Sequence, residues 1–127
     1  MNNLVLAYLG DAVYELYVRE YLINKGLGKV KDLQNASINY VSASAQTKIM
    51  EELFDKNFFT SDEIEIIKRG RNTHSHTNKS TDIITYKKST GFEALIGYLY
   101  VNDKSRLNEI MTEVLKWEYL VKTYLMN

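Results

Sequence analysis

The absence of proline is the feature that most constrains this chain. None of its 127 residues is a proline, and only six are glycines. Because proline interrupts a helix and glycine weakens one, such a sequence favours long helices with few breaks. The one β-prone segment, Ile83 to Tyr86, is short and has no obvious partner strand. We therefore expect an all-α fold. A single domain over residues 1–127 is expected, because we find no repeat, low-complexity tract or linker.

Hydrophobic spacing and end signals predict six helices. Gly26 suits the left-handed position that closes a helix. Thr60 and Glu63 form the pattern of a capping box, in which each side chain bonds the other residue's backbone amide. The polar segment 71–81 reads as an exposed loop. The predicted helices span roughly residues 4–23, 30–39, 42–54, 61–70, 89–101 and 104–125.

Charge is balanced overall but unevenly distributed. The chain has 16 Lys+Arg and 16 Asp+Glu, which taken alone argues against a nucleic-acid binder. However, the segment 51–65 holds six acids and one base, whereas 66–88 holds six bases and one acid. This distribution predicts one acidic face and one basic patch.

The sequence also points to a compartment. There is no cysteine, so neither a disulfide nor a thiolate metal site can form. No secretory signal pattern opens the chain, and no apolar run reaches membrane-spanning length. We expect a cytoplasmic protein without a membrane partner.

Three carboxylates stand where the pattern predicts burial. The segment 4–18, LVLAYLGDAVYELYV, carries only the charges of Asp11 and Glu15, and Glu93 is the only charge in GFEALIGYLYV. Burying a carboxylate costs roughly several kcal/mol unless it is paired or binds a metal. If the two helices pack together, the acids would form an all-oxygen site of the kind preferred by Mg²⁺ or Mn²⁺. Alternatively, the acids face solvent or pair with a base, as Glu15 could with Arg19.

Two segments resemble the catalytic helices of the ribonuclease III family. LAYLGDAVYELYVREYL, at 6–22, resembles the signature helix, centred on Leu9-Gly10-Asp11-Ala12. FEALIGYLYV, at 92–101, resembles the second catalytic helix. KRGRN at 68–72 and YKKSTGFE at 86–93 resemble the Mini-ribonuclease III branch, which consists of the catalytic domain alone.

The resemblance implies an activity and its residues. The expected function is a Mg²⁺-dependent endoribonuclease that hydrolyses double-stranded RNA and leaves a 5′ phosphate, with Mn²⁺ as a possible substitute. Asp11 and Glu93 fall at the family's catalytic, metal-binding positions, and Glu15 is a further candidate ligand through a bound water. Two acidic positions of the full-length enzymes are Ala7 and Thr90 here. These departures leave the number of bound ions open.

The resemblance also implies how RNA is held and how the protein assembles. The basic segment would bind RNA, with cations meeting phosphates and polar residues meeting 2′ hydroxyls, although a merely solvated loop is the alternative. Family members dimerise through the signature helix, and a tyrosine stripe on that helix suits either an interface or the core. The RNA-binding candidates are Lys68, Arg69, Arg71, Asn72, Thr73, Lys79, Lys87 and Lys88, and the homodimer candidates are Tyr14, Tyr17 and Tyr21.

The implied substrate is a precursor of large-subunit ribosomal RNA, processed with the help of a large-subunit ribosomal protein. Two other classes of function remain open. One is a non-enzymatic RNA-binding or ribosome-associated dimer with a degenerate domain, which Ala7 and Thr90 favour but Asp11 and Glu93 disfavour. The other is a helical protein-interaction domain without a role in RNA, against which the basic segment argues.

Overall fold

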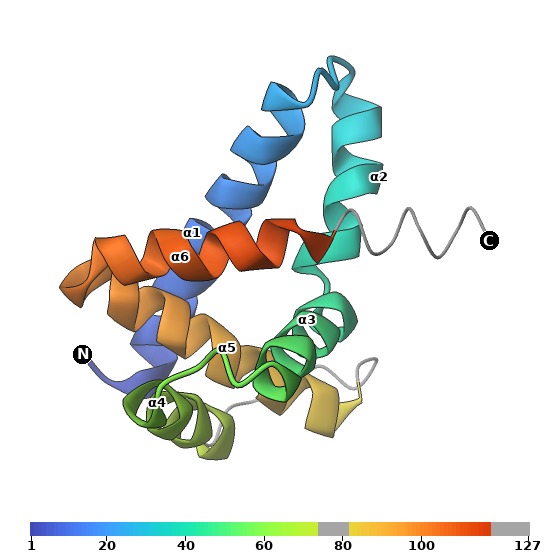
Figure 1. The fold of residues 1–127 in the computed structure, drawn as a ribbon. Helices are drawn as coiled ribbons and strands as arrows, with labels where there is room; N and C mark the ends of the chain where they lie inside the picture. The colour runs from blue at the N-terminus through green and yellow to red at the C-terminus, as the bar shows by residue number, and fades with distance from the viewer. Residues whose placement is uncertain (74–81, 118–127) are drawn as a thin grey trace.

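The all-α prediction is confirmed. The computed structural model describes residues 1–73 and 82–117, and every regular element in those two ranges is a helix (Figure 1). The predicted boundaries of the first four helices hold to within a few residues. The helices are α1 (Asn3–Asn24), α2 (Val30–Val41), α3 (Ala43–Asp55), α4 (Ser61–Asn72), α5 (Ile83–Asn102) and α6 (Lys104–Leu115).

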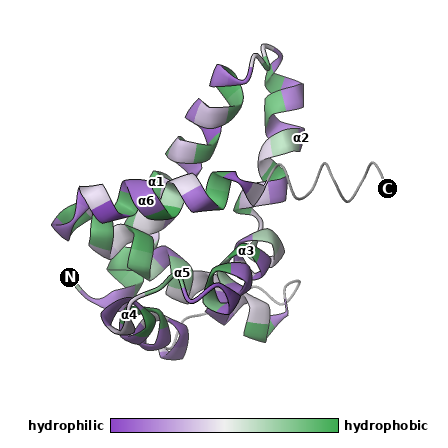
Figure 2. Cartoon of the chain, in the orientation of Figure 1, coloured by the Kyte–Doolittle hydropathy of each residue, from purple (hydrophilic) through white to green (hydrophobic). Residues whose placement is uncertain are grey.

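Helix α5 is the centre of the molecule. It packs against α1, α4, α3 and α6 (Figure 1). Its sequence explains this position, because a helix that is apolar nearly all round is stable only when neighbours cover most of its faces. Phe92, Leu95 and Ile96 are completely buried. In Figure 2, α5 is largely hydrophobic, whereas hydrophilic and hydrophobic residues alternate along α4, as expected for a helix with one buried face.

The predicted start of α5 near Ser89 is wrong, because the helix begins at Ile83. The Asp82 side chain accepts hydrogen bonds from the Ile84 amide and the Thr85 hydroxyl, each at 3.1 Å. An aspartate at this position satisfies amides that a helix start leaves without partners. The cap, together with packing against α3, outweighs the β propensity of the isoleucines.

The loop prediction for 71–81 is also corrected at its start. Arg71 and Asn72 are the last residues of α4. Residues 74–81 lie outside the described part of the chain, as does the predicted continuation of the last helix over 118–125.

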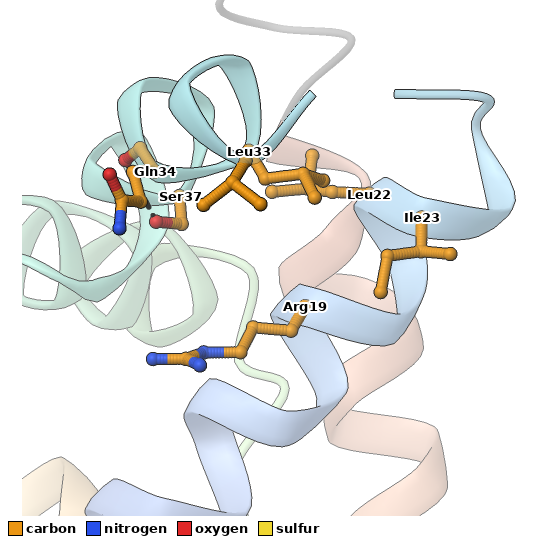
Figure 3. A pocket seen from close by; sticks show the side chains of 7 residues that line it. Arg19, Leu22, Ile23, Leu33, Gln34 and Ser37 are labelled. Atoms are coloured by element: carbon orange, nitrogen blue, oxygen red, sulfur yellow. Dashed lines mark hydrogen bonds between the residues drawn. The ribbon is translucent and has the colours of Figure 1, made fainter. Parts of the chain in front are cut away.

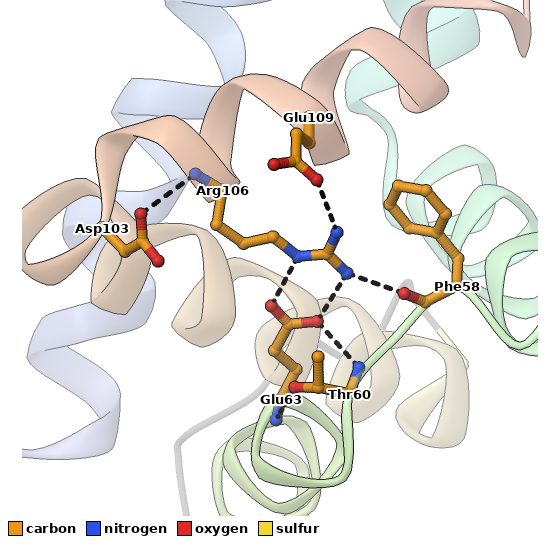
Figure 4. Close-up of polar contacts among 6 residues, drawn as sticks. All are labelled: Phe58, Thr60, Glu63, Asp103, Arg106 and Glu109. Carbon is orange, nitrogen blue, oxygen red and sulfur yellow. Dashed lines mark hydrogen bonds and ion pairs between the residues drawn. The ribbon is translucent and has the colours of Figure 1, made fainter.

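The predicted capping box is confirmed and has a further role. The Thr60 amide donates to Glu63 Oε1 at 2.9 Å, and the Glu63 amide donates to Thr60 Oγ1 at 3.2 Å. Arg106 of α6 also donates to both oxygens of Glu63, at 2.8 and 2.9 Å, and to the Phe58 carbonyl at 2.7 Å (Figure 4). This partly buried ion pair joins α6 to the start of α4.

Helix α1 has two apolar faces. Its buried face includes Val13, Tyr14 and Val18, which belong to the main core. On its outer face Tyr8 is 84% exposed and Leu16 is 56% exposed. Its second half forms a hairpin with α2 that extends from the body of the molecule (Figure 1). None of the helices in the described ranges combines the length and the apolar character that a membrane span requires.

Candidate active site

Two glycines bring the predicted catalytic helices into backbone contact. A Cβ atom on Gly10 of α1 would lie 1.8 Å from the Glu93 carbonyl oxygen of α5. A Cβ atom on Gly97 would lie 2.0 Å from the Leu6 carbonyl oxygen. No larger residue fits either position, so glycine is what allows the two helices to touch. Because Asp11 follows Gly10 directly, this crossing carries Asp11 to Glu93.

The Glu93 carboxyl is strongly affected by its surroundings. Asp11 is exposed on α1, in contrast to the burial that the sequence pattern predicted, whereas Glu93 is only partly exposed. Burial raises the pKa of Glu93, and a hydrogen bond with Asp11 and the charge of Asp11 raise it further, to about 8, against a smaller lowering effect of Gln46. No lysine or arginine in the described ranges forms an ion pair with either acid. Two carboxylates held together without a base are the arrangement that a cation stabilises.

A third side chain, which the sequence reasoning missed, reaches this pair. Gln46 of α3 is only 1% exposed, and its Nε2 donates to Glu93 Oε2 at 3.4 Å. Its own Oε1 is buried and has no hydrogen-bond partner. The available signal was its position, because Gln46 and Thr47 are the polar residues of the buried helix face that continues with Ile49, Met50 and Leu53.

The oxygen-rich composition of this site fits a hard divalent ion. The described residues contain no group of three or more His, Cys, Asp or Glu side chains around one point. The site instead offers the Asp11 and Glu93 carboxylates, and the Gln46 amide nitrogen contacts Glu93. Mg²⁺ commonly uses one or two carboxylates and fills its other positions with water and substrate phosphate. Asp11 and Glu93 would therefore hold the ion.

Glu15, one turn after Asp11 on α1, makes a contact of its own with Arg19. Its Oε1 accepts a hydrogen bond from Arg19 Nη2 at 2.8 Å, in an exposed pair one turn apart. This is the pairing that the sequence left open as the alternative to a role at the metal.

The two missing acidic positions are filled by small buried residues. Ala7 packs with Leu6 and Ala94 in a small apolar cluster. The Thr90 hydroxyl donates to the Tyr86 carbonyl at 3.0 Å, inside α5 itself. Both residues therefore contribute to packing between and within the helices around the site.

Part of the predicted RNA-binding set gathers around one groove. Lys68, Arg71 and Lys88 line a hollow of about 300 Å³ between α3, α4 and α5. Glu51 and Asp55 line it too, and Glu51 contacts Lys88 at 3.4 Å. The acidic and basic segments therefore share this groove, in contrast to the separate faces that the sequence predicted.

The other RNA-binding candidates are distributed around that groove. Arg69 and Asn72 are exposed on α4, and Lys87 is partly exposed on α5. The Thr73 hydroxyl donates to the Arg69 carbonyl at 2.7 Å and accepts from Asn3 at 3.3 Å, which joins the end of α4 to the start of α1. Lys79 lies outside the described residues.

The tyrosine stripe of α1 faces this chain's own core. Tyr14 is completely buried, donates its hydroxyl to the Tyr40 carbonyl at 2.8 Å, and packs edge-on against Phe92. Tyr17 and Tyr21 are partly buried and pack against the same core. The sequence left two locations open for this stripe, an interface and the core, and in the structure it lies in the core.

Comparisons with known proteins agree on one family. The family model described as the ribonuclease III domain matches residues 4–104. A protein of Streptococcus pneumoniae named Mini-ribonuclease 3 is 44% identical over 114 residues, which cover 88% of this chain and 89% of that protein. The Mini-ribonuclease 3 of Staphylococcus aureus is 45% identical over 120 residues, covering 90% of each. A crystal structure of a Fusobacterium nucleatum protein superimposes with a TM-score of 0.80 at 29% identity, covering 91% of this chain and 93% of that one.

Proposed function

The chain belongs to the ribonuclease III family, within its Mini-ribonuclease III branch, and is an endoribonuclease; from that premise we propose that it cleaves double-stranded RNA with Mg²⁺ held by Asp11 and Glu93. One observation carries the proposal. The Gly10–Gly97 crossing holds the Glu93 carboxylate against Asp11, and no base in the described ranges pairs with either acid. Membership of this family disfavours both the non-enzymatic and the protein-interaction alternatives.

The reaction is hydrolysis of a phosphodiester bond. Asp11 and Glu93 would hold a divalent ion, which when bound would neutralise charge at the phosphate and make a nearby water more acidic. The water oxygen would attack phosphorus and lose a proton, while the bond from phosphorus to the 3′ oxygen breaks and that oxygen takes up a proton. The products are a 5′ phosphate and a 3′ hydroxyl. Asp11 and Glu93 would contribute the negative charge that holds the ion, and the close approach of α1 and α5 at Gly10 and Gly97 keeps the two residues near each other.

The RNA backbone would lie over the groove between α3, α4 and α5. Lys68, Arg71 and Lys88 supply charge to phosphates there. Lys87, Arg69, Asn72, Thr73 and Lys79 would extend this contact. Counterion release makes such binding weaker as salt rises.

The chain would act as a homodimer, with one site for each RNA strand. The outer face of α1 is the candidate interface because Val5, Tyr8, Leu16 and Ile23 are exposed apolar residues on one helix. Beside it, a groove of about 240 Å³ between α1 and α2 includes Leu22, Ile23 and Leu33 (Figure 3). The inward-facing Tyr14, Tyr17 and Tyr21 would then support the interface from behind.

The physiological substrate would be a precursor of large-subunit ribosomal RNA in the cytoplasm, presented by a large-subunit ribosomal protein. The resemblance to the Mini-ribonuclease III branch supports this part of the proposal.

Incubation with long double-stranded RNA tests the activity itself. Cleavage should occur with Mg²⁺ or Mn²⁺, should stop when EDTA is added, and should yield ends that a 5′-phosphate-dependent exonuclease accepts. Single-stranded RNA of the same sequence is the control. Equal cleavage of both RNAs, or cleavage that persists in EDTA, would contradict the proposal.

A further inference from the structure

Gln46 is a buried amide whose hydrogen bonding is incomplete. Its side chain is enclosed between α3 and α5, with Nε2 3.4 Å from Glu93 Oε2, near the upper limit for a hydrogen bond. Oε1 is shielded from solvent and accepts no hydrogen bond. A buried polar atom without a partner destabilises the protein that contains it, so this oxygen calls for an explanation.

Packing of α3 on α5 does not explain why this buried oxygen is left without a partner. Thr47, the next residue, donates to the Thr85 carbonyl at 3.1 Å, and Glu51 contacts Lys88 at 3.4 Å. Both contacts join the two helices through residues that follow Gln46 on α3. An apolar side chain of similar size at position 46 would fill the same space without burying an unpaired oxygen.

We propose that Gln46 is the third oxygen donor of the cation site formed by Asp11 and Glu93. The inference rests on the proposed function, because it assumes that the two acids hold a divalent ion. An amide oxygen is a hard, neutral ligand, so it adds a donor without adding a third negative charge. The nitrogen is the atom that contacts Glu93 in this structure, so the assignment requires a half-turn of the terminal amide. That rotation brings the oxygen to Glu93 and puts the nitrogen in the place of the oxygen.

The assignment gives Gln46 a role that depends on the ion. Without a cation, the Nε2 group donates to Glu93 and the oxygen is unused. With a cation, the oxygen faces positive charge and the Glu93 carboxylate no longer needs the amide donor. Gln46 would thus supply one oxygen donor in a chain that has Ala7 and Thr90 where the full-length enzymes carry acids.

Direct binding of Mn²⁺ tests the assignment without reference to catalysis. Titration of the protein with Mn²⁺, followed by the electron paramagnetic resonance signal of the free ion, should show a site in the wild type that Asp11→Asn abolishes. Gln46→Leu should lower Mn²⁺ affinity about 10- to 100-fold, the range seen when supporting groups at metal sites are removed. Gln46→Glu should restore or exceed the wild-type affinity, because it returns an oxygen donor with added charge.

Thr47→Val is the matched control. It removes a polar contact of the same helix with α5 but leaves the acids untouched, so it should change thermal stability and not Mn²⁺ affinity. Each variant is first checked by circular dichroism. Should Gln46→Leu fail to fold, Gln46→Glu decides the matter, since affinity at or above the wild-type value supports the donor role and weaker binding overturns it.

The outcomes separate the two proposals. No Mn²⁺ site in the wild type, or one that survives Asp11→Asn, refutes the proposed function. A wild-type site that depends on Asp11 but is equally strong in Gln46→Leu overturns the Gln46 assignment and leaves the proposed function standing.

Discussion

At the scale of single residues, the candidate site depends as much on two glycines, which have no side chain, as on the two carboxylates. Gly10 and Gly97 lack the Cβ atoms that would separate α1 from α5. Without that close approach, Asp11 and Glu93 would be two unrelated acids on two helices. The carboxylates were identifiable from the sequence as isolated charges in apolar helices, whereas the depth of the helix crossing depends on tertiary packing.

Gly10→Ala should damage both the fold and the site. The new methyl group would lie 1.8 Å from the Glu93 carbonyl oxygen, so the helices must separate. Overpacking of this kind costs about 1–3 kcal/mol in the free energy of unfolding, and cleavage should fall because Asp11 moves away from Glu93. Gly28→Ala is the control, since no atom lies within 4 Å of its Cβ position. Equal free energies of unfolding from urea melts and equal cleavage rates for the two variants would contradict this account.

The pKa of Glu93 predicts how stability depends on pH when no metal is present. Burial and Asp11 raise the pKa of this carboxyl from 4.5 to about 8 in the folded protein. Because the folded state holds the proton more tightly, this stabilising contribution is complete below about pH 4.5 and is lost as pH rises towards 8. In EDTA, the free energy of unfolding of the wild type should therefore fall relative to that of Glu93→Gln as pH rises from about 4.5 to 8. A difference that stays constant with pH would disprove the shift.

At the scale of helices, the sequence predicted features that depend on local end signals, and it missed features that depend on packing between helices. The capping box of Thr60 and Glu63 is local, and its prediction was confirmed. The start of α5 was placed too late because Ile83 and Ile84 favour strands, while the contacts that make them helical involve Asp82 and helix α3. Gln46 was overlooked because its partner is 47 residues away in the sequence. The capping box was readable from local chemistry, whereas the pairing of Gln46 with Glu93 across the fold was not.

The ion pair between Arg106 and Glu63 should be important for the folded state. Burial raises the pKa of Glu63, but the hydrogen bonds from Arg106 and Thr60 outweigh that effect, so the pKa lies below its ordinary value. Arg106→Leu leaves this carboxylate buried without its partner and should cost about 3 kcal/mol. Adding Glu63→Gln keeps the capping box and removes the charge, so the double variant should recover much of the loss. Thermal melts that show no recovery would rule out charge burial as the cause.

At the scale of the whole molecule, the exposed apolar face of α1 is the feature that a single chain leaves unexplained. The near-total apolarity of the first helix predicted a central or interfacial position, and the structure gives it a core face and an exposed face. The sequence could not tell which apolar residues face inward, because the tyrosine stripe and the outer stripe both follow helical spacing.

Leu16→Glu should dissociate the proposed homodimer. Leu16 is 56% exposed on α1, so a charge there would cost little in the monomer but would be buried in the interface. Light scattering at micromolar concentration should show a dimer for the wild type and a monomer for the variant. Val101→Glu, at an equally apolar exposed position on α5, should remain dimeric. A wild type that is already monomeric would refute the proposed assembly.

The central claim is that Asp11 and Glu93 hold the catalytic ion, and it is tested most directly by measuring cleavage and stability on the same samples of Asp11→Asn and Glu93→Gln. Both changes preserve shape and remove charge. We predict that each variant stays folded and cleaves double-stranded RNA at least about 100-fold more slowly with Mg²⁺. Without metal and above about pH 8, where Glu93 carries a charge, each should melt at or above the wild-type temperature because repulsion between the two carboxylates is relieved. Near-wild-type cleavage by either variant, or lost stability with cleavage intact, would contradict the claim.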